Sequence, residues 1–262
     1  MDIRLENLEH VYHEGTPLEV RALHPVSLDL PGGSFLGIVG GTGSGKTTLV
    51  KHLNGLLEPT RGRVLIDGKD ASACNSELPR RVGLVFQRPE RQLFEPTVYR
   101  DISFVLRRFS RLSDTEIAKR VARACELIGI DIAGIGDRAP MSLPDGLRRK
   151  VAIAGVLVNE PEVLVLDEPA VGLDPPGVRG LLKFLERAKN AGGTGVVVVS
   201  HDMDAFLPLL DVLLVLKKGR MAALGRPCTA IAEMATDPEL RGLLAVPRSV
   251  LVRVQASEEG VS

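Results

Sequence analysis

The chain has 262 residues, and its 33 lysines and arginines balance 33 aspartates and glutamates. This length suits one large α/β domain or a two-lobed protein. The balanced charge gives no reason to expect nucleic acid or an acidic lipid surface as the main partner. Apolar runs such as "VAIAGVLV" are far shorter than the roughly 20 residues that cross a bilayer, and the charged N-terminus lacks the apolar core of a secretory signal. We therefore expect a protein that neither spans a membrane nor is exported.

Strand and helix patterns alternate along the chain. Residues 2–8 and 25–30 alternate like antiparallel strands, whereas four continuous apolar runs are typical of strands covered on both faces. These runs are "SFLGIVG", "RVGLVFQ", "EVLVLDEP" and "GTGVVVVSH". Helical patterns follow at residues 45–57, 113–129, 146–159 and 176–193. The order predicts an α/β domain with a mainly parallel central sheet.

Two segments depart from this alternation. Residues 89–159 carry mostly helical patterns, so we expect a helical subdomain inserted between two sheet strands. After residue 225 the pattern weakens, and "QASEEGVS" is typical of a frayed tail. We expect one domain over residues 1–225 and an extension over 226–262 that contributes dimer contacts.

A phosphate-binding loop (P-loop) is the strongest motif. Residues 40–47 satisfy G-x-x-x-x-G-K-[ST] between an apolar strand and a helix, the setting that the motif requires. A glycine-rich turn is the alternative, and a dinucleotide loop fits only if the frame is forced. Lys46 is expected to reach the β- and γ-phosphates, and the Thr47 hydroxyl to bind Mg²⁺. The expected nucleotide-binding residues are Gly40, Gly41, Thr42, Gly43, Ser44, Gly45, Lys46, Thr47 and Thr48.

Polar residues follow three of the buried strands. Asp167 and Glu168 end "VLVLDEP", at the sheet edge where ligands of this architecture bind. We expect Asp167 to support the Mg²⁺ shell and Glu168 to orient and deprotonate the attacking water; a plain strand terminus is the alternative. His201 ends "VVVVSH" and is expected to contact the γ-phosphate. Gln87 ends another strand, where its amide is placed to bridge Mg²⁺ or water.

The remaining histidines and the cysteines are assigned no role. The three cysteines are far apart and match no metal-ligand spacing, which suits a reducing cytosol. These residues are His10, His13, His24, His52, Cys74, Cys125 and Cys228.

With the P-loop, Gln87, "LVLDEP", "GLDP" and "VSH" in this order, residues 1–225 resemble an ATP-binding cassette (ABC) ATPase. The resemblance implies ATP and Mg²⁺ as cofactors and head-to-tail pairing of two ATPases, each ATP lying between the P-loop of one and a signature sequence of the other. It makes Asp174 of "GLD" the D-loop aspartate. Tyr12 stands where the family places an aromatic residue that stacks on adenine; a surface tyrosine is the alternative.

Within this family, "HEGTPLEVRALHPVSLDL" and "FQRPERQLFEPTVYRDISF" resemble the ATPases of energy-coupling-factor (ECF) importers of vitamins and metals. That resemblance implies an integral membrane scaffold, a separate substrate-binding membrane protein and a peripheral place on the cytoplasmic face of the membrane. The resemblance also implies that nucleic acid is not a partner and that another polypeptide chooses the substrate.

The signature segment, residues 143–147, departs from the family's L-S-G-G-Q at three of five places. Its residues are Leu143, Pro144, Asp145, Gly146 and Leu147. Pro144 replaces the serine that would bind the partner's γ-phosphate, and losing such a bond costs roughly 1.5–3 kcal/mol. Asp145 adds repulsion of roughly 3 kcal/mol for unit charges about 5 Å apart at an effective dielectric of about 20. The same residues suit a well-capped helix start, with Ser142 as a further cap or a partial substitute.

We therefore expect an asymmetric heterodimer with a non-identical paralogue. ATP in this chain's P-loop is hydrolysed when the companion supplies an intact signature, whereas the companion's ATP turns over poorly. Two other readings stay open at this point. One is a soluble ABC ATPase that acts as a nucleotide-gated clamp on nucleic acid or ribosomes without transport. The other is a regulatory subunit that binds ATP without hydrolysing it, which the intact Glu168 and His201 argue against.

Overall fold

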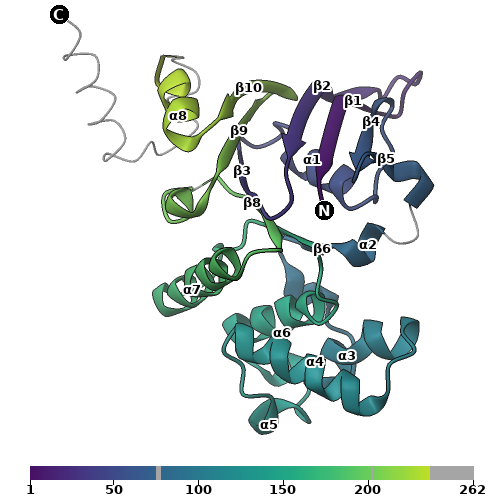
Figure 1. Cartoon of the computed structure of the whole chain (residues 1–262), viewed down its shortest axis with the longest axis vertical. Helices are drawn as coiled ribbons and strands as arrows, with labels where there is room; N and C mark the ends of the chain where they lie inside the picture. Colours follow the sequence, from purple (N-terminus) through teal and green to yellow (C-terminus); the bar gives the residue numbers. More distant parts are fainter. Residues whose placement is uncertain (75–77, 202, 237–262) are drawn as a thin grey trace, which may run out of the picture.

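The fold consists of two β-sheets and a helical insertion (Figure 1). The structure is a computed structural model that describes residues 1–74, 78–201 and 203–236. The strands are β1 (Ile3–Tyr12), β2 (Val20–Leu30), β3 (Phe35–Val39), β4 (Arg61–Ile66), β5 (Lys69–Asp70), β6 (Val82–Val85), β7 (Val163–Asp167), β8 (Gly195–Val199), β9 (Val212–Lys217) and β10 (Arg220–Gly225). The α-helices are α1 (Lys46–Leu53), α2 (Leu78–Arg81), α3 (Val98–Phe109), α4 (Asp114–Leu127), α5 (Ile132–Ile135), α6 (Asp145–Leu157), α7 (Pro175–Ala191) and α8 (Pro227–Thr236). Short 3₁₀ turns cover Ala71–Cys74, Pro89–Gln92, Pro140–Ser142 and Leu207–Leu209.

The central sheet has the strand order β10-β9-β3-β8-β7-β6 and is parallel except for its edge strand β10. All five residues of β3, β7 and β8 are buried, as the continuous apolar runs predict. Alternate side chains enter two different hydrophobic cores: Val196 and Val198 face the one with α3, α4, α6 and α7, and Val197 and Val199 the one with α1 and the first sheet. Because both faces are covered, these strands are apolar up to Asp167 at the end of β7.

The N-terminal sheet has the order β2-β1-β4-β5, and its paired strands are antiparallel. Buried and exposed residues alternate along β2, which fits a sheet with one face on a core. Its buried face packs on α1 and the central sheet. The predicted N-terminal antiparallel strands are confirmed.

A helical insertion, the chain between β6 and β7, contains α3 to α6 and lies below the two sheets in Figure 1. Its helices α3 and α4 each bury one face, for example Ile117, Val121 and Ala124 of α4. The predicted helical insertion is confirmed, while the limits given for the domains stay predictions. Among the residues described, no helix is long and apolar enough to cross a membrane. Residues 237–262, including the predicted tail, lie outside the described part.

Candidate functional site

Four parallel strands of the central sheet end at one edge, and each is followed by or ends in a sequence-predicted residue. The P-loop follows β3, Gln87 follows β6, Asp167 ends β7 and His201 follows β8. Carboxyl ends of parallel strands are where open α/β sheets bind ligands. The structure therefore brings together residues that lie more than a hundred positions apart in the chain.

The P-loop has the shape that a phosphate group requires. Gly45 takes a left-handed φ of 98° at the start of α1 and offers no capping side chain to the helix. A Cβ at Gly40 would overlap the Leu216 carbonyl and the Ser44 hydroxyl. That hydroxyl is buried and has no hydrogen-bond partner among the described residues. An orphaned buried donor beside the open N-terminus of a helix fits phosphate oxygens.

Lys46 crosses this loop. Its Nζ donates to the carbonyl oxygens of Gly40 and Gly41 at 2.7 and 2.9 Å. Burial lowers the pKa of this amine, and the carboxylates of Glu168 and Asp167 oppose that shift. The ammonium group is thus held against the P-loop backbone, where it interacts electrostatically with both carboxylates.

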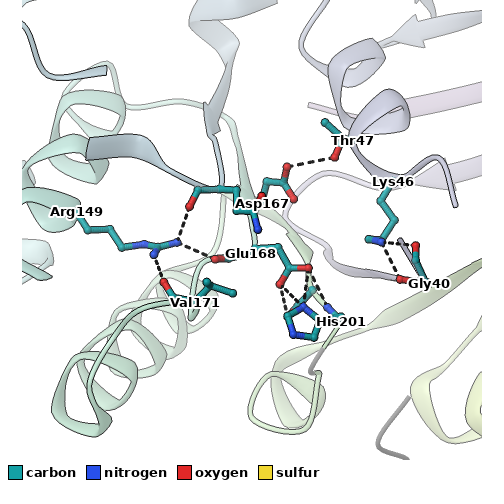
Figure 2. Close-up of polar contacts among 11 residues, drawn as sticks. Gly40, Lys46, Thr47, Arg149, Asp167, Glu168, Val171 and His201 are labelled. Atoms are coloured by element: carbon teal, nitrogen blue, oxygen red, sulfur yellow. Dashed lines mark hydrogen bonds and ion pairs between the residues drawn. The ribbon is translucent and has the colours of Figure 1, made fainter. Parts of the chain in front are cut away.

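Thr47 and Asp167 form a pair of oxygen donors suited to Mg²⁺. The Thr47 hydroxyl lies 3.4 Å from Oδ2 of Asp167 (Figure 2). Burial and the neighbouring Glu168 raise the pKa of Asp167, whereas Thr47 and Lys46 lower it. Two crowded carboxylates and a hydroxyl are a hard donor set, and a divalent cation would relieve their repulsion. Gln87 is exposed at the end of β6, and its contact to metal or water stays a prediction.

Glu168 is the most constrained carboxylate of the site. Ser200 Oγ donates to its Oε2 at 3.1 Å, and the His201 backbone N–H donates to its Oε1 at 3.2 Å. The His201 Nδ1 lies 2.9 Å from both oxygens, as a donor in the Nδ1–H tautomer. His201 therefore faces Glu168, and its predicted contact to the γ-phosphate stays a prediction. Ser200 was missed, although a polar residue at the end of "VVVVS" was the available signal.

A buried cluster that was not predicted from the sequence packs against the P-loop helix α1. Nε2 of His52 lies 3.1 Å from Nδ1 of His10, and His52 Nδ1 lies 2.7 Å from the Thr48 carbonyl oxygen. Burial lowers the pKa of His52 to about 4. Tyr12 packs edge-on against His10 with its hydroxyl 3.2 Å from Thr48 Oγ1. Tyr12 thus adjoins the P-loop, and its stacking on adenine stays a prediction.

The signature segment begins α6. Leu143 is buried, and Pro144 precedes the helix without a side-chain cap. Asp145, largely exposed, forms an ion pair with Arg148 one turn on, which the charge estimate from sequence did not include. Ser142 does not cap α6, because its hydroxyl donates to the Ala139 carbonyl at 2.7 Å. The two further signature residues are the half-buried Gly146 and Leu147.

Asp174 begins the next helix. Its Oδ1 accepts a hydrogen bond from the Gly177 N–H at 2.9 Å, and α7 follows with prolines in its first turn. Asp174 is therefore the N-cap of α7, and its D-loop role toward a partner stays a prediction.

Of the cysteines whose side chains are described, Cys125 is buried with a pKa raised to about 11, and Cys228 is exposed.

Comparison with known proteins agrees with this geometry. The family model "ABC transporter" matches residues 23–171. The energy-coupling factor transporter ATP-binding protein EcfA2 of Symbiobacterium thermophilum is 46% identical over 266 residues, covering 100% of this chain and 90% of that protein. The EcfA2 protein of Clostridium tetani is 43% identical, covering 99% and 90%.

Two solved structures are similar over most of the chain. CbiO1 of Clostridium perfringens, part of the ABC transporter complex CbiONQ, has a TM-score of 0.78 and 35% identity, covering 96% of this chain and 98% of that one. A dimeric ATP-binding cassette in a post-hydrolysis state with ADP and Pi has a TM-score of 0.76 and 26% identity, covering 86% and 98%. The chain belongs to the ABC transporter family as an ATP-binding subunit of the energy-coupling factor type, an ATPase whose hydrolysis of ATP is coupled to transport.

Proposed function

We propose that this chain is one of two non-identical ATPases that power an ECF-type importer of a vitamin or transition-metal ion. It would lie on the cytoplasmic face of the membrane, beneath an integral scaffold and a substrate-binding membrane protein. Similarity to CbiO1, part of the CbiONQ complex, supports this kind of assembly. The dimeric similar cassette supports pairing of two ATPase subunits.

In this proposal each residue of the sheet edge has one task. Backbone N–H groups of the P-loop, Lys46 and the Ser44 hydroxyl bind the phosphates, and Thr47 and Asp167 would hold Mg²⁺. An ion bound there would supply positive charge against the phosphate oxygens. Glu168 accepts the proton of the attacking water, while Ser200 and the His201 N–H keep its carboxylate aimed.

The observation that carries the asymmetric pairing is the start of α6, where Pro144 and Asp145 occupy the signature segment. Pro144 has neither a hydroxyl nor a backbone N–H to offer a γ-phosphate. The ion pair with Arg148 offsets part of the Asp145 charge, so the missing serine is the main defect. The companion's ATP would therefore lack a donor, whereas this chain's ATP depends on the companion's signature.

The test compares ATP turnover by the purified chain alone, by the chain with its companion, and by the whole transporter in lipid vesicles. We expect slow turnover alone and rapid turnover with the companion. Full activity of the lone chain would refute the asymmetric scheme, and so would loss of activity when only the companion's glutamate is neutralised. Recovery of nucleic acid in place of membrane proteins after affinity purification would favour the clamp.

A further inference from the structure

Arg149 is a buried arginine on α6 that reaches the edge of the central sheet. The residue is 6% exposed and lies in the second turn of a helix that starts at Asp145. Its guanidinium donates to the carbonyl oxygens of Val171, of Glu168 at 2.7 Å and of Gln87 at 3.4 Å (Figure 2). One side chain of the helical insertion therefore contacts the segments that follow β6 and β7.

The chemistry of these contacts suits arginine. A guanidinium presents five donors in a rigid planar fork, so it can hold several carbonyl oxygens at once, whereas a lysine offers one compact head. Hydrogen bonds from a charged donor are stronger than those between neutral groups, and in a buried site solvent screens them less. The three acceptors are main-chain atoms, so the arginine fixes the path of the backbone.

The backbone at Glu168 needs such support. Glu168 has a φ of 50°, in the left-handed region that non-glycine residues seldom adopt. Its N–H donates to the Val199 carbonyl at 2.7 Å, and its own carbonyl accepts from Arg149. Hydrogen bonds with β8 and with α6 therefore hold the peptide groups on either side of this unfavourable conformation. The direction of the carboxylate follows from that conformation.

We propose that Arg149 is a positioning residue that keeps Glu168 and the start of the Gln87 segment in register with α6. This inference rests on the proposed function, in which Glu168 is the base and α6 faces the companion's ATP. Arg149 lies four residues after Asp145, or about 6 Å along the helix. A displacement of the signature segment when the companion closes would therefore move the guanidinium, and with it the backbone that aims Glu168.

The experiment compares Arg149→Met, Arg149→Lys and Lys150→Met in the complex with the companion ATPase. Lys150 is the matched control, because its Nζ lies 3.5 Å from the Gly129 carbonyl in the helical insertion and does not reach the sheet edge. For Arg149→Met we expect kcat to fall about 10- to 100-fold while KM for ATP stays within about threefold. Arg149→Lys should recover part of the loss, and Lys150→Met should change kcat by less than about twofold.

Three results would overturn the inference. They are a kcat for Arg149→Met within about twofold of the wild type, an equal loss in Lys150→Met, or a joint loss of ATP binding and thermal stability that lysine does not relieve. If Arg149→Met does not fold, Arg149→Lys decides, since an unchanged kcat there contradicts the proposal and a several-fold loss at constant KM supports it. Glu168→Gln serves as the reference: if it keeps full turnover, the proposed function fails, whatever Arg149 does.

Discussion

In the proposed pairing, the edge of the central sheet forms one half of the site for this chain's own ATP, and the start of α6 forms one half of the site for the companion's ATP. The two halves differ in how they meet an anion. At the sheet edge, the P-loop is built from glycines, the Ser44 hydroxyl and Lys46, and its shape suits a phosphate group. At the start of α6, Asp145 places a carboxylate where the helix would otherwise receive an anion. Because the two halves lie on separate elements, a chain can keep one and alter the other without losing its fold.

The largest expected effect comes from a substitution in the sheet-edge half. Glu168→Gln removes the proposed base but keeps its size and hydrogen-bonding oxygen, so turnover of the complex should fall about 100- to 10,000-fold while ATP stays bound. Phosphate release and retained nucleotide measure the two outcomes. Glu162→Gln is the control, because Glu162 precedes the opposite end of β7, where it pairs with Arg81. Retained turnover in the Glu168→Gln complex would refute the base assignment.

The second effect concerns the support of the P-loop helix. His52 has a pKa of about 4 in the folded chain against 6.5 in the unfolded one, so below pH 6.5 the unfolded state takes up a proton that the folded state does not. The free energy of unfolding should be fully retained above pH 6.5 and fall by about 3 kcal/mol as the pH approaches 4. His10, whose pKa burial also lowers, acts with the same sign.

Denaturant unfolding of the wild type, His52→Gln and His13→Asn across this pH range measures the effect. The difference between wild type and variant at each pH removes the contribution of carboxylates such as Glu162, whose pKa is lowered by Arg81. His13 is exposed with a φ of 54°, which asparagine tolerates, so this control should keep the wild-type slope. An equal slope in His52→Gln would contradict the assignment to His52.

How far the sequence predicts this molecule depends on the range of the contacts. The P-loop and the buried strands follow from local pattern, since β3, β7 and β8 are covered on both faces and therefore read as apolar runs. The Asp145–Arg148 pair could also have been found, because residues three apart share a helix face.

Contacts between distant segments could not be predicted. Arg149 stands in "RRK", which reads as an exposed basic cluster, and only the packing of α6 against the sheet reveals its burial. The contact between His10 and His52 joins β1 to α1, 42 positions apart, and neither residue has a local pattern that pairs it with the other. Strand β4 and the edge strand β10, with half or more of their residues exposed or half-buried, lack the apolar run that marks the central strands.

The third effect comes from restoring the signature segment at the start of α6. Pro144→Ser, Asp145→Gly and Leu147→Gln together restore the family's L-S-G-G-Q, and the regained hydrogen bond should raise turnover by the lone chain about 10- to 100-fold. Steady-state phosphate release at high protein concentration measures this gain. Asp145→Gly alone should recover less, because Arg148 already offsets part of the carboxylate charge. A folded triple variant with unchanged turnover would mean that the lone chain fails for a reason other than its signature segment.

The smallest effect asks whether Asp145 serves its own helix. A carboxylate in the first turn of a helix contributes roughly 0.3–1 kcal/mol, and Pro144 supplies no side-chain cap, so Asp145→Ala should lower the free energy of unfolding by that amount. High salt should shrink the loss, because Asp145 is exposed. Asp145→Asn controls for the loss of side-chain volume. If Asp145→Ala instead stabilises the chain at low salt, the acid opposes its own helix, and a role toward the companion's nucleotide becomes the remaining physical explanation for a carboxylate at this place.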